Sequence, residues 1–202
     1  MSVQLTAPAD HPAAFRRMVA GLSAVELRPE VVVSELPPPQ RLAPFAVAIN
    51  ANVMRGEEEL ADGRLVILHD PDGQDVWEGS TRCVAYVQAD VDVEIASDPM
   101  LPAVGWSWLI DALEASGAGH VAAGGTVTRT TSERFGALTA HPTAAEVEIR
   151  ASWSPATDDL GPHLVAFTEL MCLAAGLPPM PPGVVPMPAT RRRRRPAAST
   201  RH

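Results

Sequence analysis

The sequence predicts an α+β protein with a single, mostly antiparallel sheet of about six strands and about three helices packed on one face. The predicted elements follow the order helix, four strands, helix, two strands, helix, which lacks the strand–helix alternation of a parallel doubly wound sheet. Residues 81–95 and 146–153 alternate apolar with polar side chains, as strands do in a sheet that keeps one face in solvent.

The first half of the chain is expected to supply one helix and four strands. Residues 11–23 place apolar side chains at helical spacing behind Asp10, a candidate N-cap. Asp62-Gly63 and Asp72-Gly73 are turn signals that would separate neighbouring strands. The strands are expected at residues 30–34, 45–53, 65–68 and 81–95, and the inward face of the last is Cys83, Ala85, Val87, Ala89, Val91, Val93 and Ile95.

The second half is expected to add a helix, two strands and a final helix. Pro102 and Gly117 bracket the first of these helices, at residues 103–116, because proline favours helix starts and glycine favours helix ends. Trp106 and Trp108 within it point about 200° apart, so Trp108 is either part of an exposed patch with Trp77 or Trp153, or a second core contact. The remaining elements are strands at residues 125–131 and 146–153 and a helix at residues 162–175.

Length and charge indicate a folded body followed by a tail. We expect a single globular domain over residues 1–177, because 202 residues are enough for one substantial core. Residues 178–202 are rich in proline and arginine, bury little apolar surface and are expected to be disordered. Six of the sixteen arginines lie in residues 191–202, so the rest of the chain has ten basic against twenty-four acidic side chains and should repel nucleic acid.

The protein is expected to be cytoplasmic and not to enter a membrane. Its N-terminus lacks the charged and apolar segments of an export signal, and no stretch is apolar enough for a membrane span. In the reducing cytoplasm Cys83 and Cys172 should stay as buried thiols among apolar neighbours, and we assign them no chemistry.

No motif predicts a metal, a cofactor or a catalytic group. The acidic run from His69 to Asp75 lacks the glycine and glutamate positions of an EF-hand, and a hairpin turn explains it without a ligand. Residues 117–122 match a permissive dinucleotide fingerprint but follow a helix, whereas that fingerprint must follow a strand and open a helix. We therefore expect no cofactor, and an enzyme is less expected than a binding protein.

Nine strings, in order along the chain, resemble an uncharacterised actinobacterial family, the domain of unknown function number 3000. The strings are Arg28-Pro29-Glu30, Pro39-Gln40-Arg41-Leu42-Ala43-Pro44, Gly63-Arg64-Leu65, His69-Asp70-Pro71, Trp77-Glu78-Gly79, Val104-Gly105-Trp106-Ser107-Trp108-Leu109, Gly125-Thr126-Val127-Thr128, Ile149-Arg150-Ala151-Ser152-Trp153 and Ala174-Ala175-Gly176-Leu177-Pro178-Pro179. The resemblance spans about residues 12–185. It implies no activity, because the family has no established reaction.

Three functional hypotheses follow. The first is a non-enzymatic binding or adaptor domain for an unidentified protein partner, with Trp108 in the binding patch. The second is a small enzyme or ligand-binding protein with a cleft between helix and sheet. Its polar candidates border or interrupt apolar strands, and they are Arg41, His69, Asp70, Trp77, Glu78 and Arg150, with Arg64 and Arg82 outside this set. The third is nucleic-acid association through the tail residues Arg191, Arg192, Arg193, Arg194 and Arg195.

Overall fold

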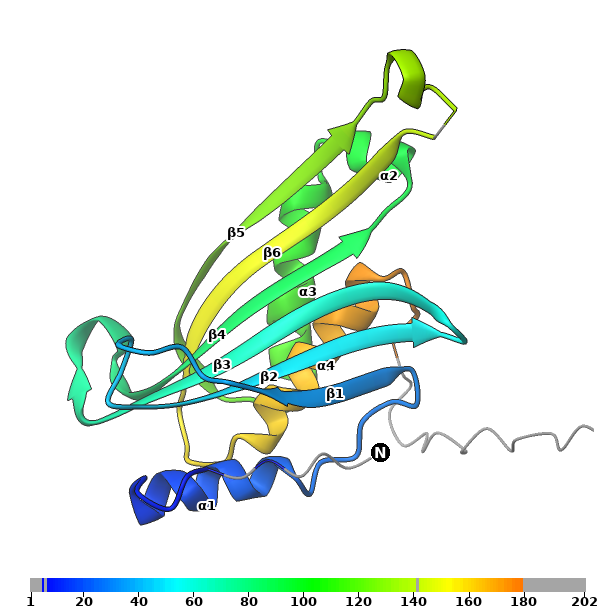
Figure 1. Ribbon diagram of the computed structural model, residues 1–202. Helices are drawn as coiled ribbons and strands as arrows, with labels where there is room; N and C mark the ends of the chain where they lie inside the picture. The colour runs from blue at the N-terminus through cyan, green and yellow to red at the C-terminus, as the bar shows by residue number, and fades with distance from the viewer. Residues whose placement is uncertain (1–4, 6, 141, 180–202) are drawn as a thin grey trace, which may run out of the picture.

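The computed structural model describes residues 5, 7–140 and 142–179 and has the predicted α+β architecture (Figure 1). All strand pairs are antiparallel and form one open sheet in the order β1-β2-β3-β4-β6-β5. The strands are β1 (Val31–Leu36), β2 (Phe45–Arg55), β3 (Glu58–Gln74), β4 (Gly79–Asp90), β5 (His120–Ser132) and β6 (Ala144–Pro155). This sheet confirms the predicted fold class.

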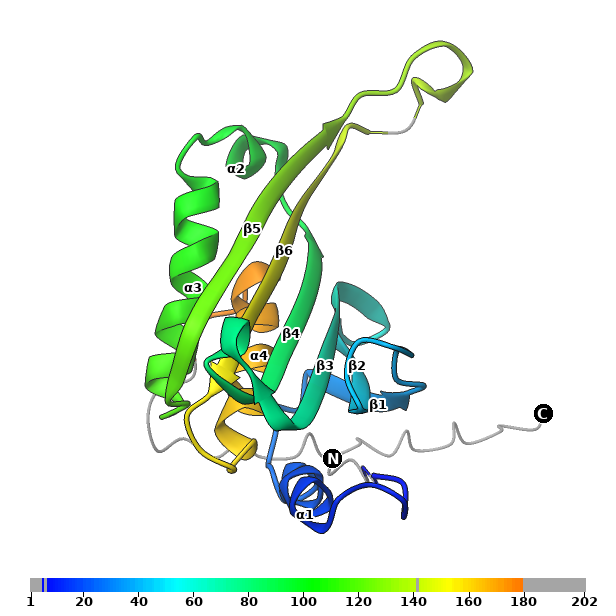
Figure 2. The ribbon, with the colours of Figure 1, turned by 90° about the vertical axis from the view of Figure 1, so that its left-hand side faces the viewer.

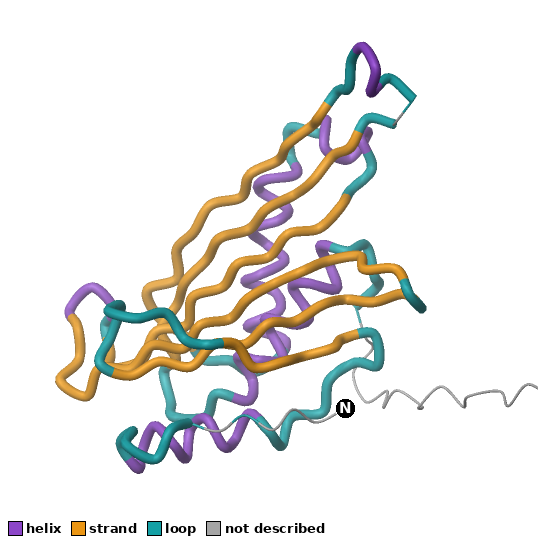
Figure 3. Tube along the Cα trace, viewed as in Figure 1, coloured by secondary structure: helices purple, strands orange, loops and turns teal. Residues whose placement is uncertain are grey.

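Helices cover one face of the sheet. The α-helices in the described residues are α1 (Ala13–Leu22), α2 (Val93–Ser97), α3 (Leu101–Ala115) and α4 (Gly161–Ala174), and the 3-10 helices are η1 (Asp75–Trp77) and η2 (Gly136–Leu138). α3 and α4 pack together, α3 against β5 and α4 against β2, β3 and β4 (Figure 2). α1 crosses one end of the sheet and contacts α4 (Figure 1). The other face of the sheet is open over its central strands in the described part of the chain (Figure 3).

The core lies between the sheet and helices α1, α3 and α4. Alternate residues of each strand point into it, so Val87 of β4 and Ile149 of β6 are opposite each other and both fully buried. Burial of each such side chain contributes about 1.5–3 kcal/mol. Cys83 and Cys172 are free and buried in the same core, as predicted.

The helix starts differ in one detail from the prediction. Pro12, not Asp10, is at the N-cap of α1, and no side chain caps that helix end. The reason is local: the backbone N–H of His11 donates to the Pro8 carbonyl at 3.1 Å, which places Asp10 in a turn ahead of the helix. The helices predicted at residues 11–23, 103–116 and 162–175 are otherwise confirmed with ends that differ by a few residues.

The predicted strand over residues 81–95 is wrong at its C-terminal end. β4 ends at Asp90, and Val93 and Ile95 lie in α2, where they are 37% and 47% exposed. The register between β4 and β6 ends with Asp90 opposite Glu146, and one more backbone hydrogen bond follows, from the Val91 N–H to the Ala145 carbonyl at 3.0 Å. Because β6 begins at Ala144, Val93 and Ile95 lie beyond its end. The apolar–acidic alternation therefore continues in the sequence beyond the point where a β-partner exists.

The two predicted Asp-Gly turns are also wrong. Asp62-Gly63 lies inside β3, and a left-handed Gly56 makes the turn between β2 and β3 instead. Gly63 is needed for packing, because a Cβ atom there would come within 2.8 Å of the Met171 sulfur of α4. Asp72-Gly73 lies in the last part of β3, which continues to Gln74, and η1 then connects β3 to β4.

Candidate functional site

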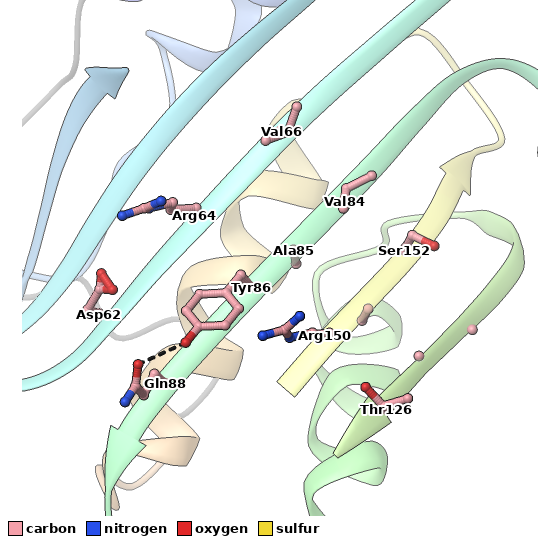
Figure 4. Close-up of a pocket in the computed structure, with 13 residues that line it drawn as sticks. Asp62, Arg64, Val66, Val84, Ala85, Tyr86, Gln88, Thr126, Arg150 and Ser152 are labelled. Atoms are coloured by element: carbon pink, nitrogen blue, oxygen red, sulfur yellow. Dashed lines mark hydrogen bonds between the residues drawn. The ribbon is translucent and has the colours of Figure 1, made fainter. Parts of the chain in front are cut away.

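The open face of the sheet contains a groove in which side chains of β3, β4, β5 and β6 meet (Figure 4). Its volume is about 730 Å³, within the range of about 300–1,000 Å³ typical of small-ligand sites. The residues that line it are Asp62, Arg64, Val66, Val84, Ala85, Tyr86, Gln88, Gly124, Gly125, Thr126, Arg150, Ala151 and Ser152. We call it the open-face groove.

The groove is hollow because small residues occupy part of one row across the sheet. Val66, Val84, Ser152 and Gly124 are neighbours in register on β3, β4, β6 and β5. A Cβ atom built on Gly124 would meet nothing within 4 Å. The row therefore has valine methyl groups at one end and unoccupied space over a glycine at the other.

The next row places Tyr86 between two arginines. Arg64, Tyr86 and Arg150 are directly opposite one another on β3, β4 and β6. Because neighbouring strands are about 4.8 Å apart, the backbones of the two arginines lie about 10 Å apart. The guanidinium carbon of Arg150 is 5.5 Å from the centroid of the Tyr86 ring, whereas Arg64 extends from β3 toward β2 (Figure 4).

Hydrogen bonds hold Tyr86 and Arg150 in place. The Tyr86 hydroxyl oxygen lies 2.8 Å from Gln88 Oε1 and 3.1 Å from Glu148 Oε2, and its one hydrogen can be donated to either acceptor. Gln88 Nε2 donates to Glu146 Oε2 at 2.9 Å, and Arg150 Nε donates to Glu148 Oε1 at 2.8 Å. These contacts link β4 to β6 on the open face.

The same contacts determine the charges in the groove. Burial and the hydrogen bond with Glu148 raise the pKa of Tyr86, so its phenol is neutral around pH 7. The hydrogen bond from Arg150 lowers the pKa of Glu148, so this carboxylate is ionised. Neither group changes its protonation state near neutral pH.

Two arginines at the groove have no acidic partner within the described residues. Arg64 is exposed and makes no ion pair or hydrogen bond there. Arg82 has only neutral acceptors: Nη1 donates to the Ala122 carbonyl at 2.9 Å and to Ser154 Oγ at 3.2 Å, and Nη2 donates to Ser152 Oγ at 2.8 Å. Burial lowers the pKa of Arg82, because its charge is partly removed from water. Since Ser152 lines the groove, the Arg82 guanidinium lies at the groove's edge.

The segment between β3 and β4 folds over one end of the open face. Trp77 of η1 packs on Leu68 and Ala46, with Val66 against the same cluster. η1 also contacts β5, the edge strand that follows β4 and β6 in the sheet. Because Val66 belongs both to this cluster and to the open-face groove, the segment borders the groove.

The structure disperses the seven binding residues that were predicted from the sequence, and only Arg150 lines the groove. Asp70 lies in the last part of β3, and Trp77 and Glu78 lie in the connection between β3 and β4. Asp70 accepts a hydrogen bond from Gln74 Nε2 at 3.1 Å, which supports the end of β3, and Glu78 is exposed. These three residues are thus next to the groove but not inside it.

The other three predicted binding residues lie elsewhere. His69 is buried on the helix side, stacked on Phe15 of α1 with ring centroids 5.0 Å apart and 3.0 Å from Thr81 Oγ1. Arg41 is exposed in the loop between β1 and β2. Trp108 of α3 is partly buried and packs against the core, as the core-contact alternative expects. The groove itself is on the sheet face away from the helices, not in a helix–sheet cleft.

Sequence reasoning missed Tyr86, Glu148, Gly124 and Ser152, because each belongs to the polar face of a predicted strand or to its ends. Strand register brings them together, and no local pattern specifies register between β4 and β6. Two signals were present nevertheless. Tyr86 is the only tyrosine of the chain, and Gly124 belongs to a Gly-Gly pair inside a strand, which often marks a bulge or a close approach.

The described residues place limits on other kinds of site. None of their helices is long and apolar enough to cross a membrane. Within them, no three or more His, Cys, Asp or Glu side chains are grouped so that they could hold a metal ion. The tail predicted beyond residue 177 is described only to Pro179, and the predicted nucleic-acid residues Arg191–Arg195 lie outside the described residues.

Comparison with protein families shows which family the chain resembles. The model of a family described as "Protein of unknown function (DUF3000)" matches residues 11–185, which confirms the family resemblance seen in the sequence strings. No curated protein and no solved structure matches the chain.

Proposed function

The chain belongs to the family described as Protein of unknown function (DUF3000), and we propose that it is a binding protein whose ligand occupies the open-face groove. The observation that supports the proposal is that apolar, aromatic and positively charged side chains meet at one groove. Valine methyl groups, the Tyr86 ring and guanidinium groups from different strands border a volume of about 730 Å³. A hollow that combines apolar surface with a few placed polar groups is the usual form of a ligand site.

The ionisable groups of the groove favour binding over catalysis. A general acid or base works best when its pKa is close to the operating pH. Here the pKa of Tyr86 is raised and the pKa of Glu148 is lowered, so both move away from neutrality. Their hydrogen bonds to each other and to Arg150 also occupy the atoms that would take part in proton transfer.

The groove supports a ligand-binding role better than the helical tryptophan patch does. Trp108 is partly covered by the core, whereas the groove is open to solvent on the sheet face. Ligand binding on the open face also leaves the core unchanged, because the inward residues of the same strands alternate with the groove residues. We therefore propose the open face, not α3, as the binding surface.

Equilibrium dialysis of the full chain against a small-molecule extract of its own cells tests this function. Mass spectrometry of the two compartments should show at least one compound enriched with the wild-type protein. Gly124→Phe should abolish the enrichment, because its side chain projects into the groove from a position with free space. The control is Ser107→Phe, which adds the same side chain on the exposed side of α3.

The two variants make the outcome decisive. Enrichment with the wild type and Ser107→Phe but not with Gly124→Phe supports the groove as the binding site. Enrichment that survives in Gly124→Phe, or no enrichment of any compound by the wild type, contradicts the proposed function. Circular dichroism and thermal unfolding of both variants show whether each is folded as the wild type is.

A further inference from the structure

We infer that the ligand of the open-face groove is a small amphipathic organic anion, with its acidic group against the arginines and its apolar part on the valines. This inference rests on the proposed function and specifies the chemical class of the ligand. Three features support it: the charge at the groove, the apolar row beside that charge, and the position of the groove within the sheet.

The charge at the groove is opposite to that of the chain. Of the charged residues that line it, Arg64 and Arg150 are cations and Asp62 is an anion, so the lining itself has one positive charge in excess. Just outside the lining are a further arginine, Arg82, and the carboxylates Glu146 and Glu148, which hydrogen-bond to lining side chains. The chain as a whole has a formal charge of −8. An excess of positive charge in an acidic protein selects for anions and disfavours cations at this point of the surface.

Arg82 is the best-defined anchor for an acidic group. A guanidinium group has five N–H donors in a fixed plane, and three hydrogen bonds from Arg82 go to the neutral acceptors Ala122, Ser152 and Ser154. These bonds orient the guanidinium but do not neutralise it. Among the described residues no carboxylate hydrogen-bonds to Arg82, and Glu78 acts on its charge only through space. A partly buried charge in this position gains more from a directly bound anion than an exposed charge does, because water competes less.

Arg64 supplies a second cation that is free to move. Its side chain is exposed and extends toward β2, and within the described residues no partner holds it there (Figure 4). Rotation about its side-chain bonds brings the guanidinium over Tyr86, the neighbour of Arg64 in register. Arg150 already lies over the other side of this ring.

The apolar row requires more than an inorganic anion. Val66 and Val84 present methyl groups to the groove, and the space over Gly124 continues the same row. A bare phosphate or sulfate would leave these surfaces in water, whereas a hydrocarbon or aromatic part would bury them at about 25 cal/mol per Å². The ligand therefore carries both an acidic and an apolar part.

The location of the groove disfavours an extended polypeptide. A peptide that adds to a sheet pairs with an edge strand, and the edges here are β1 and β5. Tyr86 is on β4, an inner strand whose backbone is paired on both sides. A compact molecule fits the groove volume without needing a free strand edge.

Fluorescence titration of the full chain with 8-anilinonaphthalene-1-sulfonate, a small aromatic anion, tests this class directly. The matched neutral probe is N-phenyl-1-naphthylamine, which has the same rings without the sulfonate. We expect the anionic probe to bind at least about tenfold more tightly than the neutral probe, because a charge-assisted hydrogen bond is worth that factor. Sodium pyrophosphate, added as a competitor, represents an anion without an apolar part and should displace the probe poorly.

Four variants locate the probe. Arg64→Gln and Arg82→Gln should each weaken the anionic probe about tenfold and leave the neutral probe unchanged, while Gly124→Phe should weaken both. Arg16→Gln removes an exposed arginine of α1, away from the groove, and should change neither. Arg64 is exposed and has no partner in the part of the chain that the structure describes, so Arg64→Gln remains informative even where Arg82→Gln disturbs folding.

Each result decides between the claims. Equal affinity for the two probes, or affinity for the anionic probe that Arg64→Gln and folded Arg82→Gln leave unchanged, overturns the anion class. Tight displacement by pyrophosphate overturns the amphipathic part. If dialysis enriches a neutral compound through the groove, the proposed function stands and the anion class fails, whereas insensitivity of both probes and of dialysis to Gly124→Phe removes the groove itself.

Discussion

Two adjacent glycines in β5 face opposite sides of the sheet, and their surroundings differ. A Cβ atom on Gly125 would lie 2.3 Å from the Arg150 carbonyl oxygen, whereas one on Gly124 would meet nothing within 4 Å. Gly125→Ala should therefore lower the free energy of unfolding by about 2–4 kcal/mol, and Gly124→Ala should change it by less than about 1 kcal/mol. Urea denaturation of the two variants measures both values, and equal effects would contradict the backbone spacing between β5 and β6.

His163 makes the stability of the protein depend on pH. It is buried, and its Nδ1 accepts a hydrogen bond from Trp153 Nε1 at 3.0 Å, which requires the neutral ring. Burial lowers the pKa of His163 from 6.5 to about 4, and nearby His120 acts in the same direction. Between these pH values the unfolded chain binds more protons than the folded one, so stability is complete above pH 6.5 and falls toward pH 4. The loss attributable to His163 is about 3 kcal/mol.

His163→Asn isolates this contribution, because its side-chain oxygen can still accept from Trp153 but does not titrate. Denaturation of the wild type and the variant at pH 7 and at pH 4 gives two differences in the free energy of unfolding. The wild type should lose about 3 kcal/mol more than the variant over this interval. His69, whose pKa burial also lowers, is present in both proteins and cancels from the comparison. An identical pH dependence would show that His163 is already protonated, or exposed, in the folded protein.

At the scale of elements, the end of β4 lies between Val87 and Val93, which the sequence alternation predicts to be buried on the same face of one strand. Val87 is fully buried opposite Ile149, whereas Val93 is 37% exposed in α2. Val87→Ala should cost about 2 kcal/mol, and Val93→Ala should change stability by less than about 0.5 kcal/mol. Thermal and urea unfolding of the pair check this. A similar loss of stability in Val93→Ala would show that Val93 is buried, as the longer predicted strand requires.

The same comparison shows how far sequence patterns reach. Alternation in β4 and β6 and the proline–glycine bracket of α3 predict elements correctly, because each signal is contained within the element. β4 ends close to the start of β6, and the Asp62-Gly63 step stays extended because Gly63 pairs with Ala51 of β2 and Val87 of β4. Both causes lie far away in the sequence, so local patterns could not reveal them.

The candidate site was less predictable than the fold for the same reason. Arg150 was selected because it interrupts an apolar strand, yet its partners Tyr86 and Glu148 are ordinary polar positions in their own strands. Glu148 lies two residues from Arg150 on the same face of β6, whereas only the register between β4 and β6 places Tyr86 beside them. The hollow at Gly124 exists because glycine has no side chain there. It becomes part of a groove only because Ser152 of β6 lies opposite it.

At the scale of the whole molecule, Arg28 connects the start of β1 with the end of α4. It is largely buried; Nη1 donates to the Pro178 carbonyl at 3.0 Å and is 3.5 Å from Glu169 Oε2, and Nε is 3.6 Å from Glu30 Oε2. Burial raises the pKa of Glu169, and the charge of Arg28 and its hydrogen bond oppose this shift. Arg28→Met should lower the free energy of unfolding by about 2–3 kcal/mol, since it leaves Glu169 without its partner.

A double variant distinguishes the ion pair from simple packing. Arg28→Met combined with Glu169→Met should recover at least half of the loss, because no uncompensated charge is then left in place. Urea denaturation at pH 7 of the wild type, the two single variants and the double variant completes the cycle. Additive effects of the two single changes would show that Arg28 acts through the Pro178 carbonyl or through its methylene groups instead.

The sheet consists of two units that are each continuous in sequence, a meander of β1 to β4 and a hairpin of β5 and β6. They are joined by the pairing of β4 with β6, which runs from Cys83 opposite Trp153 to Asp90 opposite Glu146. The open-face groove lies across the junction of β4 and β6, with Tyr86 in the first unit and Arg150 in the second. A ligand that contacts both units should stabilise the pairing of β4 with β6 and slow the exchange of the amide hydrogens in that ladder. Deuterium uptake along that ladder can thus report occupancy before the occupant has been identified.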